Sequence, residues 1–170
     1  MASRSSVTGT TIQISISRGG VPKRAIAEGV LTPVGIEGDA HAHPQIHGGP
    51  QQAVLLVTAE TVDELAARGY PVYYGAMGEN LTTRGLDRRL LRAGQRFRLG
   101  TALIELIRIR VPCASQDIYG PSLKREVYDD AVKAGDVTSP RWAMSGFYAA
   151  VIGPGVVHRD DEITLESELA

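Results

Sequence analysis

The apolar residues of this chain come in short runs and alternations of strand length, separated by glycines and prolines. Residues 11–17 alternate isoleucine with polar residues, which is the period of a strand with one buried face. Residues 53–57 and 147–152 are continuously apolar, as expected for strands buried on both faces. Even the longest run, 147–152, is far shorter than the roughly 18 to 20 residues that cross a bilayer. The sequence therefore predicts a mainly β protein that does not span a membrane.

A hairpin and two helices complete the expected framework. Residues 97–111 contain two apolar stretches joined by the turn Gly100-Thr101, a pattern typical of paired antiparallel strands. Thr58 is a suitable N-cap for a helix that ends before Gly69. A second, amphipathic helix is expected over about residues 122–133. We expect roughly six to eight short strands that close, or nearly close, into a β-barrel with peripheral helices, because closure removes exposed sheet edges.

Composition limits the classes of function. The 170 residues are 43% hydrophobic and 22% charged, which fits one soluble domain over residues 1–170. Eighteen basic against 19 acidic residues leave a net charge of -1, so no positive field favours nucleic-acid binding. Residues 1–11 are polar and lack the apolar core of a secretory signal. We therefore expect a cytoplasmic protein with no nucleic-acid or membrane partner, and the sequence leaves its oligomeric state open.

Cys113, the only cysteine, follows directly after the apolar stretch that ends the expected hairpin. A single thiol excludes an intramolecular disulfide and a structural zinc site built on paired cysteines. Arg110, expected on the same strand face as Arg108, would stabilise a thiolate or bind an anion if the Pro112 turn brings it to Cys113. A lone cysteine fits a small buried hydrophobic residue equally well. Position alone leaves both interpretations open.

A second candidate site lies in the histidine-rich segment 38–49. Asp39, His41, His43 and His47 are residue types that bind zinc or iron, although no helical HExxH spacing or closed ligand set is present. Alternatively, Asp39 orients one histidine that polarises or protonates a ligand. A polar loop with exposed histidines is the third interpretation.

Two further segments carry weaker signals. Gly78-Glu79-Asn80 combines a glycine that permits close backbone approach with an amide that both donates and accepts, which suits a heterocyclic ligand. A turn into a strand is the alternative. The arginine-rich stretch from Arg84 to Arg98 is typical of a solvated face, because phosphate binding would need those side chains to converge and their spacing does not show it.

Three ordered segments resemble a known family. They are GIEGDAHAHPQIHGGPQQAVLLVTAE (35–60), GENLTTRGLDRRLLRAGQRFRLGTALIELIRIRVPC (78–113) and SGFYAAVIGPG (145–155). Together they closely resemble the MOSC domain, named for the C-terminal domain of molybdenum-cofactor sulfurases. The resemblance covers about residues 19–165 and is strongest to the small stand-alone bacterial members, including the hydroxylaminopurine-resistance proteins.

The resemblance implies a β-barrel with Cys113 at the mouth of a pocket, where family members bind the molybdenum cofactor (molybdopterin) or carry sulfur on the cysteine. In the molybdenum-reductase branch, the corresponding thiolate is a ligand of the metal. The residues implied as cofactor-binding are Arg110, Asn80, Glu79, Asp39, His41 and His47.

Two uses of Cys113 then remain. The leading hypothesis is an oxidoreductase in which Cys113 ligates molybdenum and a small N-hydroxylated substrate is reduced with electrons from a donor protein. The alternative is a sulfur-carrier or cofactor-delivery module with a persulfide on Cys113. A separate cysteine desulfurase would supply that sulfur, because none of the lysines lies in a motif for pyridoxal phosphate. A hydrolase pairing Cys113 with His41 or His47 has the residue types but no geometric support.

Overall fold

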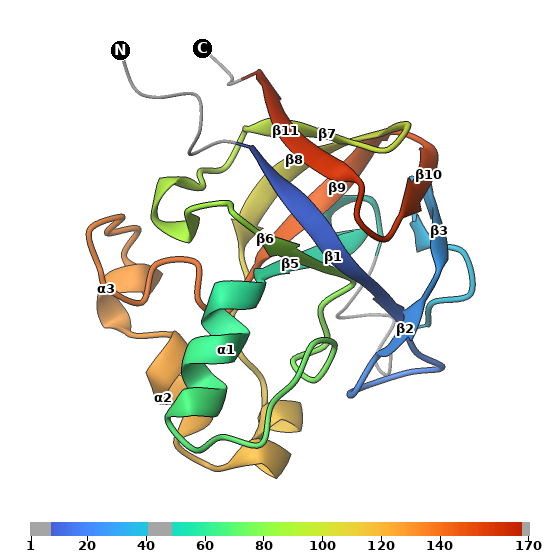
Figure 1. Cartoon of the computed structure of the whole chain (residues 1–170). Helices are drawn as coiled ribbons and strands as arrows, with labels where there is room; N and C mark the ends of the chain where they lie inside the picture. The colour runs from blue at the N-terminus through green and yellow to red at the C-terminus, as the bar shows by residue number, and fades with distance from the viewer. Residues whose placement is uncertain (1–7, 41–48, 168–170) are drawn as a thin grey trace.

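Seven strands pair edge to edge until the last meets the first and closes a barrel (Figure 1). The structure is a computed structural model that describes residues 8–40 and 49–167. In order around the barrel the strands are β1 (Thr8–Ile16), β11 (Glu162–Ser167), β7 (Arg96–Leu99), β8 (Ala102–Ile109), β9 (Phe147–Gly153), β5 (Val54–Thr58) and β6 (Leu81–Arg84). The prediction of a mainly β, barrel-forming chain is confirmed.

Four further strands lie outside this ring. β2 (Arg24–Ile26) pairs with β1, while β3 (Glu28–Thr32), β4 (Gly35–Ile36) and β10 (Gly155–His158) form a separate three-stranded sheet. They bring the described part of the chain to eleven strands, more than the six to eight expected. The surplus arises mainly in the glycine- and proline-rich region before residue 50, where the strands are too short to leave a clear alternation.

The expected hairpin and first helix are both present. Leu99 pairs with Ala102 across the turn, so β7 and β8 are antiparallel neighbours. Helix α1 (Ala59–Ala67) begins at Thr58, whose side-chain oxygen accepts a hydrogen bond from the Thr61 backbone N–H. It provides the crossover between β5 and β6, which are parallel and therefore cannot be joined by a tight turn.

The second helix is not the single helix expected over 122–133. It is divided into α2 (Leu123–Val127) and α3 (Asp130–Lys133). Tyr128 between them is extended, with φ -155 and ψ 140, and its side chain packs against both hydrophobic clusters of the protein. The Asp129 carboxylate accepts a hydrogen bond of 2.8 Å from the Val132 backbone N–H and so starts a new helix. The Asp129 cap and the packing of Tyr128 therefore favour two short helices over one continuous helix.

Two hydrophobic clusters organise the interior. The larger fills the barrel and includes Phe97, Ile104 and Phe147. The smaller lies between the barrel and the helices and includes Leu65 of α1 and Leu123 of α2. Figure 1 shows α1, α2 and α3 gathered on one side of the barrel. No helix in the described residues is long and apolar enough to cross a membrane.

Three short 3-10 helices connect these elements. They are η2 (Pro50–Gln52), η3 (Arg88–Leu90) and η4 (Ala114–Tyr119). The last begins directly after Cys113, so it fixes the direction in which the chain leaves the end of β8.

Gly75 offers a test of how tightly the loop before β6 is packed. Its φ is 96, and an added Cβ would collide with the backbone oxygen of Lys23, whereas Gly69 has φ 99 and open space around it. Both positions impose left-handed strain on alanine, but only Gly75 adds a backbone clash. We predict that Gly75→Ala lowers the free energy of unfolding by about 1–3 kcal/mol more than Gly69→Ala, measured by urea unfolding. Equal losses would show that this close approach does not constrain the fold.

Candidate functional site

Cys113 lies just beyond the end of β8, outside the wall of the barrel. Its side chain is partly exposed, and it belongs to neither hydrophobic cluster. Its Sγ atom is 2.8 Å from the Oγ atom of Ser115, on the η4 helix that follows. The thiol is therefore accessible and has a hydroxyl beside it, so the interpretation as a buried hydrophobic residue loses its support.

The Arg110 side chain lies in the interior, although it is only three residues from Cys113. It is 5% exposed, its Nε atom donates to the Ser145 carbonyl at 2.9 Å, and its Nη1 atom donates to the Met77 carbonyl at 2.6 Å. The Ser145 hydroxyl donates in turn to the Arg110 carbonyl at 2.6 Å. Arg110 thus ties the end of β8 to two loops that are distant in the sequence.

The strand alternation expected for Arg108 and Arg110 does not give them similar surroundings. Arg108 is exposed, with its guanidinium carbon 5.5 Å from the centre of the Tyr148 ring, whereas Arg110 is buried. The pairing of β8 with β9 is irregular between Leu106 and Arg108. Val111, at the end of the apolar stretch, is 64% exposed. The sequence contains no local signal for this change.

Glu79 is a buried carboxylate whose charge acts on the Arg110 guanidinium. It has no exposed surface, and its oxygens accept hydrogen bonds from the Met77 backbone N–H at 3.1 Å and the Thr82 hydroxyl at 3.5 Å. Burial raises the pKa of Glu79 from 4.5 to about 7, against the opposing effects of backbone hydrogen bonds and the Arg110 charge. Burial also lowers the pKa of Arg110, while the charges of Tyr148, Glu79 and Cys113 raise it.

Asn80 turns into a different buried network from its neighbour Glu79. Its Nδ2 atom donates to the Ser15 carbonyl at 3.1 Å and to Asp39 at 2.8 Å, and its Oδ1 atom accepts from the Leu55 backbone N–H at 3.0 Å. The other Asp39 oxygen accepts from Lys23 at 2.6 Å, with both side chains almost fully buried. The structure therefore brings Asp39 and Asn80 together and satisfies their polar groups with protein partners.

Two residues that the sequence did not single out contribute to the site. Lys23 neutralises Asp39, but the two are far apart in sequence and no motif connects them. Tyr119, at the end of η4, is 8% exposed, and its hydroxyl lies beside the Tyr73 hydroxyl. Burial, followed by the charges of Tyr73 and Glu79, raises the pKa of Tyr119 to about 12. Neither role has a local sequence signal.

His41, His43 and His47 lie outside the described residues, so their predicted roles are not located in the structure. Within residues 8–40 and 49–167, no group of three or more histidine, cysteine or acidic side chains is arranged to hold a metal ion. The cofactor-binding roles of Arg110, Glu79, Asn80 and Asp39 stay predictions, and the structure places all four side chains in buried positions.

The Lys23–Asp39 pair predicts an asymmetric response to mutation. Asp39→Ala leaves a buried ammonium group unpaired and should lower the free energy of unfolding by about 3–5 kcal/mol. The double variant Lys23→Met/Asp39→Ala removes that charge and should lose less. Arg98→Ala, at an exposed ion pair with Glu166, is the control and should cost about 1 kcal/mol or less. A double variant less stable than Asp39→Ala, measured by urea unfolding, would contradict the assignment.

Glu79 predicts a pH dependence of stability. Because its pKa is raised to about 7 in the folded protein, the folded state keeps a proton that the unfolded state releases above pH 4.5. The free energy of unfolding should therefore fall as pH rises through this interval and level off above it, by about 3 kcal/mol from this group. Glu79→Gln should lack that loss when unfolding is compared at about pH 5 and about pH 8. The same pH dependence in both proteins would refute the assignment.

Sequence comparison finds two relatives of this chain. It is 31% identical over 145 residues to Protein YiiM of Escherichia coli (strain K12), a match that covers 83% of this chain and 60% of that protein. It is 37% identical over 98 residues to the uncharacterized protein YflK of Bacillus subtilis (strain 168), covering 55% of this chain and 43% of that protein. The chain thus spans less than two thirds of the length of these curated relatives.

Solved structures share the fold. The crystal structure of YiiM from Escherichia coli has a TM-score of 0.69 at 25% identity and covers 95% of this chain and 71% of that chain. YiiM from Geobacillus stearothermophilus has a TM-score of 0.70 at 22% identity, covering 94% and 75%. The YuaD protein of Bacillus subtilis has a TM-score of 0.67 at 21% identity, covering 92% and 94%.

The family assignment rests on more than these individual relatives. The family model of the MOSC domain matches residues 43–164, which is most of the chain, and includes Cys113 and the segment that precedes it. The chain therefore belongs to the MOSC domain family.

Proposed function

We propose that the protein binds the molybdenum cofactor and reduces small N-hydroxylated substrates, with Cys113 as a ligand of the metal. One observation carries the proposal: the single thiol of the chain is partly exposed at the end of a barrel strand, outside both hydrophobic clusters. A buried cysteine would be inert, whereas this one is accessible to a ligand. Membership of the MOSC family agrees with this use of the residue.

The Cys113 thiol fits the metal of the proposed cofactor. A thiolate is a soft ligand that suits a redox-active metal, and Cys113 would hold molybdenum through Sγ. When bound, the cofactor would supply the two-electron redox chemistry, while the protein supplies binding, orientation and charge.

A separate electron donor supplies the electrons for the proposed reduction. An N-hydroxylated substrate takes up two electrons and two protons, its N–O bond breaks, an N–H bond forms and water leaves. Ser115 would position the Cys113 sulfur through the 2.8 Å contact between Oγ and Sγ. Arg110 would hold the strand end in place through its hydrogen bonds to the Ser145 and Met77 carbonyls.

The second candidate function is a sulfur carrier or cofactor-delivery module. The accessibility of Cys113 also favours it, because a persulfide can be loaded and unloaded only on an exposed sulfur. Since Cys113 is the only cysteine, no second thiol of the chain would release that sulfur as a disulfide forms. A separate desulfurase would add one sulfur atom to Cys113, and an acceptor enzyme would remove it.

The test compares three proteins purified without oxygen from a host that makes the cofactor. Wild type should contain near-stoichiometric molybdenum and pterin, and it should reduce hydroxylaminopurine when an artificial electron donor is supplied. Cys113→Ser should retain less molybdenum through purification and lose activity, because a hydroxyl is a poor ligand where a soft thiolate is needed. Ser115→Ala, which keeps the thiol but removes the hydroxyl that positions it, should retain the metal and lose part of the activity.

The outcomes separate the two functions. Equal activity in wild type and Cys113→Ser would show that Cys113 takes no part in the reaction. If wild type contains neither molybdenum nor pterin, but has one extra sulfur on the peptide that holds Cys113, the result would contradict the oxidoreductase function and support the sulfur carrier.

A further inference from the structure

The ends of β8 and β9 near Cys113 present polar side chains on the outer face of the barrel. Ile109 packs against the cluster that fills the barrel and Phe147 belongs to it, so both side chains face inward. Arg108 and Tyr148, their direct neighbours along the two strands, therefore face outward. Tyr148 accordingly packs against the smaller cluster, on the helical side of the barrel wall.

Arg108 and Tyr148 form a cross-strand pair on this outer face. They lie directly opposite each other where β8 pairs with β9. The guanidinium carbon of Arg108 lies over the Tyr148 ring, 5.5 Å from its centre, in a cation–π contact. The N–H donors of a guanidinium group lie in its plane, so a contact through its face does not use them. The ring therefore supports an exposed positive charge without occupying its donors.

The same face leads to Cys113. The Arg110 backbone N–H donates to the Gly146 carbonyl at 2.8 Å, so the chain still runs beside the start of β9 two residues beyond Arg108. It reaches Cys113 three residues later. Burial raises the pKa of the Tyr148 hydroxyl. The charges of Arg110 and Arg108 lower it, and that of Cys113 raises it. Charges act in this way over short distances, so the thiol and both cations lie in the surroundings of Tyr148.

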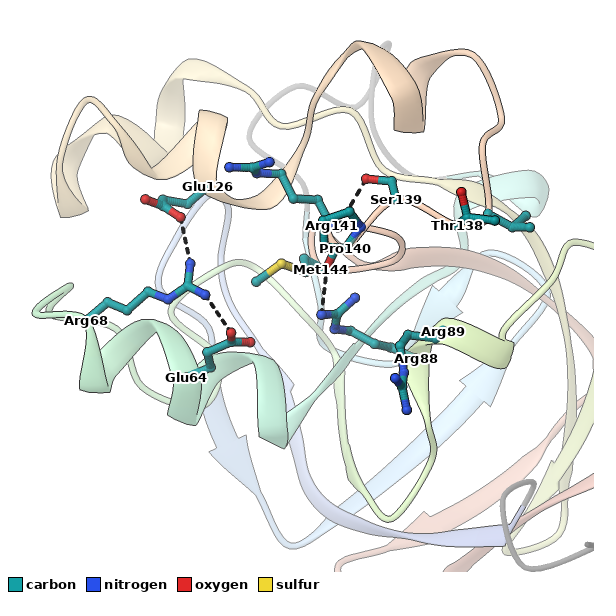
Figure 2. A pocket seen from close by; sticks show the side chains of 11 residues that line it. Glu64, Arg68, Arg88, Arg89, Glu126, Thr138, Ser139, Pro140, Arg141 and Met144 are labelled. Carbon is teal, nitrogen blue, oxygen red and sulfur yellow. Dashed lines mark hydrogen bonds and ion pairs between the residues drawn. The ribbon is translucent and has the colours of Figure 1, made fainter.

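Other arginines of the chain hold parts of the fold together. Figure 2 shows this in a cavity of about 610 Å³, where Arg68 lies between Glu64 and Glu126 at 2.7 Å from each. In the same cavity, Arg88 donates to the Trp142 carbonyl at 2.6 Å. These contacts join α1 to α2, and η3 to the segment before β9. The arginines of this cavity are engaged by the protein itself, so we assign them no ligand.

We propose that Arg108 determines specificity by binding an anionic group, a phosphate or a carboxylate, carried by the N-hydroxylated substrate. The inference rests on the proposed function, because that function places the substrate at Cys113. The Cys113 sulfur is also outside the barrel wall, so a substrate held there has the Arg108 charge on the same side. A guanidinium group binds either anion through paired, charge-assisted hydrogen bonds. The preferred substrates are therefore N-hydroxylated nucleotides or N-hydroxylated aromatic acids, in place of their uncharged counterparts.

Matched substrate pairs test the proposal, because the two members of each pair differ mainly in one anionic group. The first pair is the ribonucleoside of hydroxylaminopurine and the monophosphate of that ribonucleoside. The second is para-hydroxylaminobenzamide and para-hydroxylaminobenzoate. Wild type loaded with cofactor and supplied with an artificial electron donor should have a higher kcat/KM for the anionic member of at least one pair. Preference for the monophosphate assigns a phosphate, and preference for the benzoate assigns a carboxylate.

Arg108→Gln should remove this preference. The KM of the preferred anionic substrate should rise about tenfold, because charge-assisted hydrogen bonds are lost. The kcat values, and the KM of the uncharged substrates, should stay as in wild type, because only a binding contact is removed. Arg108→Lys keeps the charge without the planar fork and should fall between the two proteins. A purely structural role of Arg108 would change the constants of charged and uncharged substrates alike.

The matched control is Arg98→Gln. Arg98 is exposed, and it pairs with Leu103, at the end of β8 that is far from Cys113. The variant therefore changes the net charge of the protein as Arg108→Gln does, and it should leave both substrate preferences unchanged.

Calorimetric titration with the reaction products separates this inference from the proposed reaction. Wild type should bind adenosine monophosphate more tightly than adenosine, or para-aminobenzoate more tightly than para-aminobenzamide, and Arg108→Gln should lose the difference. If wild type reduces none of the four substrates but shows this Arg108-dependent binding, the proposed reaction fails and the anion site stands.

Three results would overturn the proposal. One is that wild type neither reduces nor binds the anionic member of either pair better than the uncharged one. Another is that Arg98→Gln and Arg108→Gln lose the preference equally, which would make it an effect of net charge. The third is that Arg108→Gln loses bound pterin during purification, which would assign the cation to the cofactor and not to the substrate.

Discussion

The buried Arg110 guanidinium connects the barrel to the chemistry proposed at its rim. It donates to the Ser145 and Met77 carbonyls, so it joins the end of β8 to the loops that precede β9 and β6. A buried guanidinium is costly unless its donors are engaged. Moving either loop would leave one of these donors without its acceptor, so the arrangement resists change. The direction in which the chain continues to Cys113 depends on it. The position of the accessible thiol therefore depends on a buried polar network.

The same region contains a second buried network with a different role. The Asp39 carboxylate accepts hydrogen bonds from Lys23, in the loop after β1, at 2.6 Å and from Asn80, directly before β6, at 2.8 Å. Glu79 and Asn80 are consecutive yet contribute to separate networks. Two polar networks thus hold loops that are distant in sequence, while hydrophobic clusters hold the barrel and its helices. Polar groups of this kind specify one arrangement of loops where apolar contacts alone would permit several.

Local patterns predicted the regular elements of the fold, and long-range contacts determined the rest. The capping residue Thr58 and the turn Gly100-Thr101 act within a few residues, and the helix and hairpin expected from them are present. The division of the second helix at Tyr128 depends on packing against two clusters, which no local pattern encodes. The position of Cys113 after a strand was visible in the sequence. The burial of Arg110 and the pairing of Lys23 with Asp39 were not, because their partners lie far away along the chain.

The central claim is that the Cys113 sulfur binds molybdenum, and X-ray absorption at the molybdenum edge tests it directly. The measurement counts the sulfur atoms around the metal in wild type and in Cys113→Ser loaded with the cofactor in vitro. The account predicts one sulfur ligand fewer in Cys113→Ser than in wild type, with the pterin sulfurs unchanged. The same number of sulfur ligands in both proteins, or no metal retained by wild type, would contradict it.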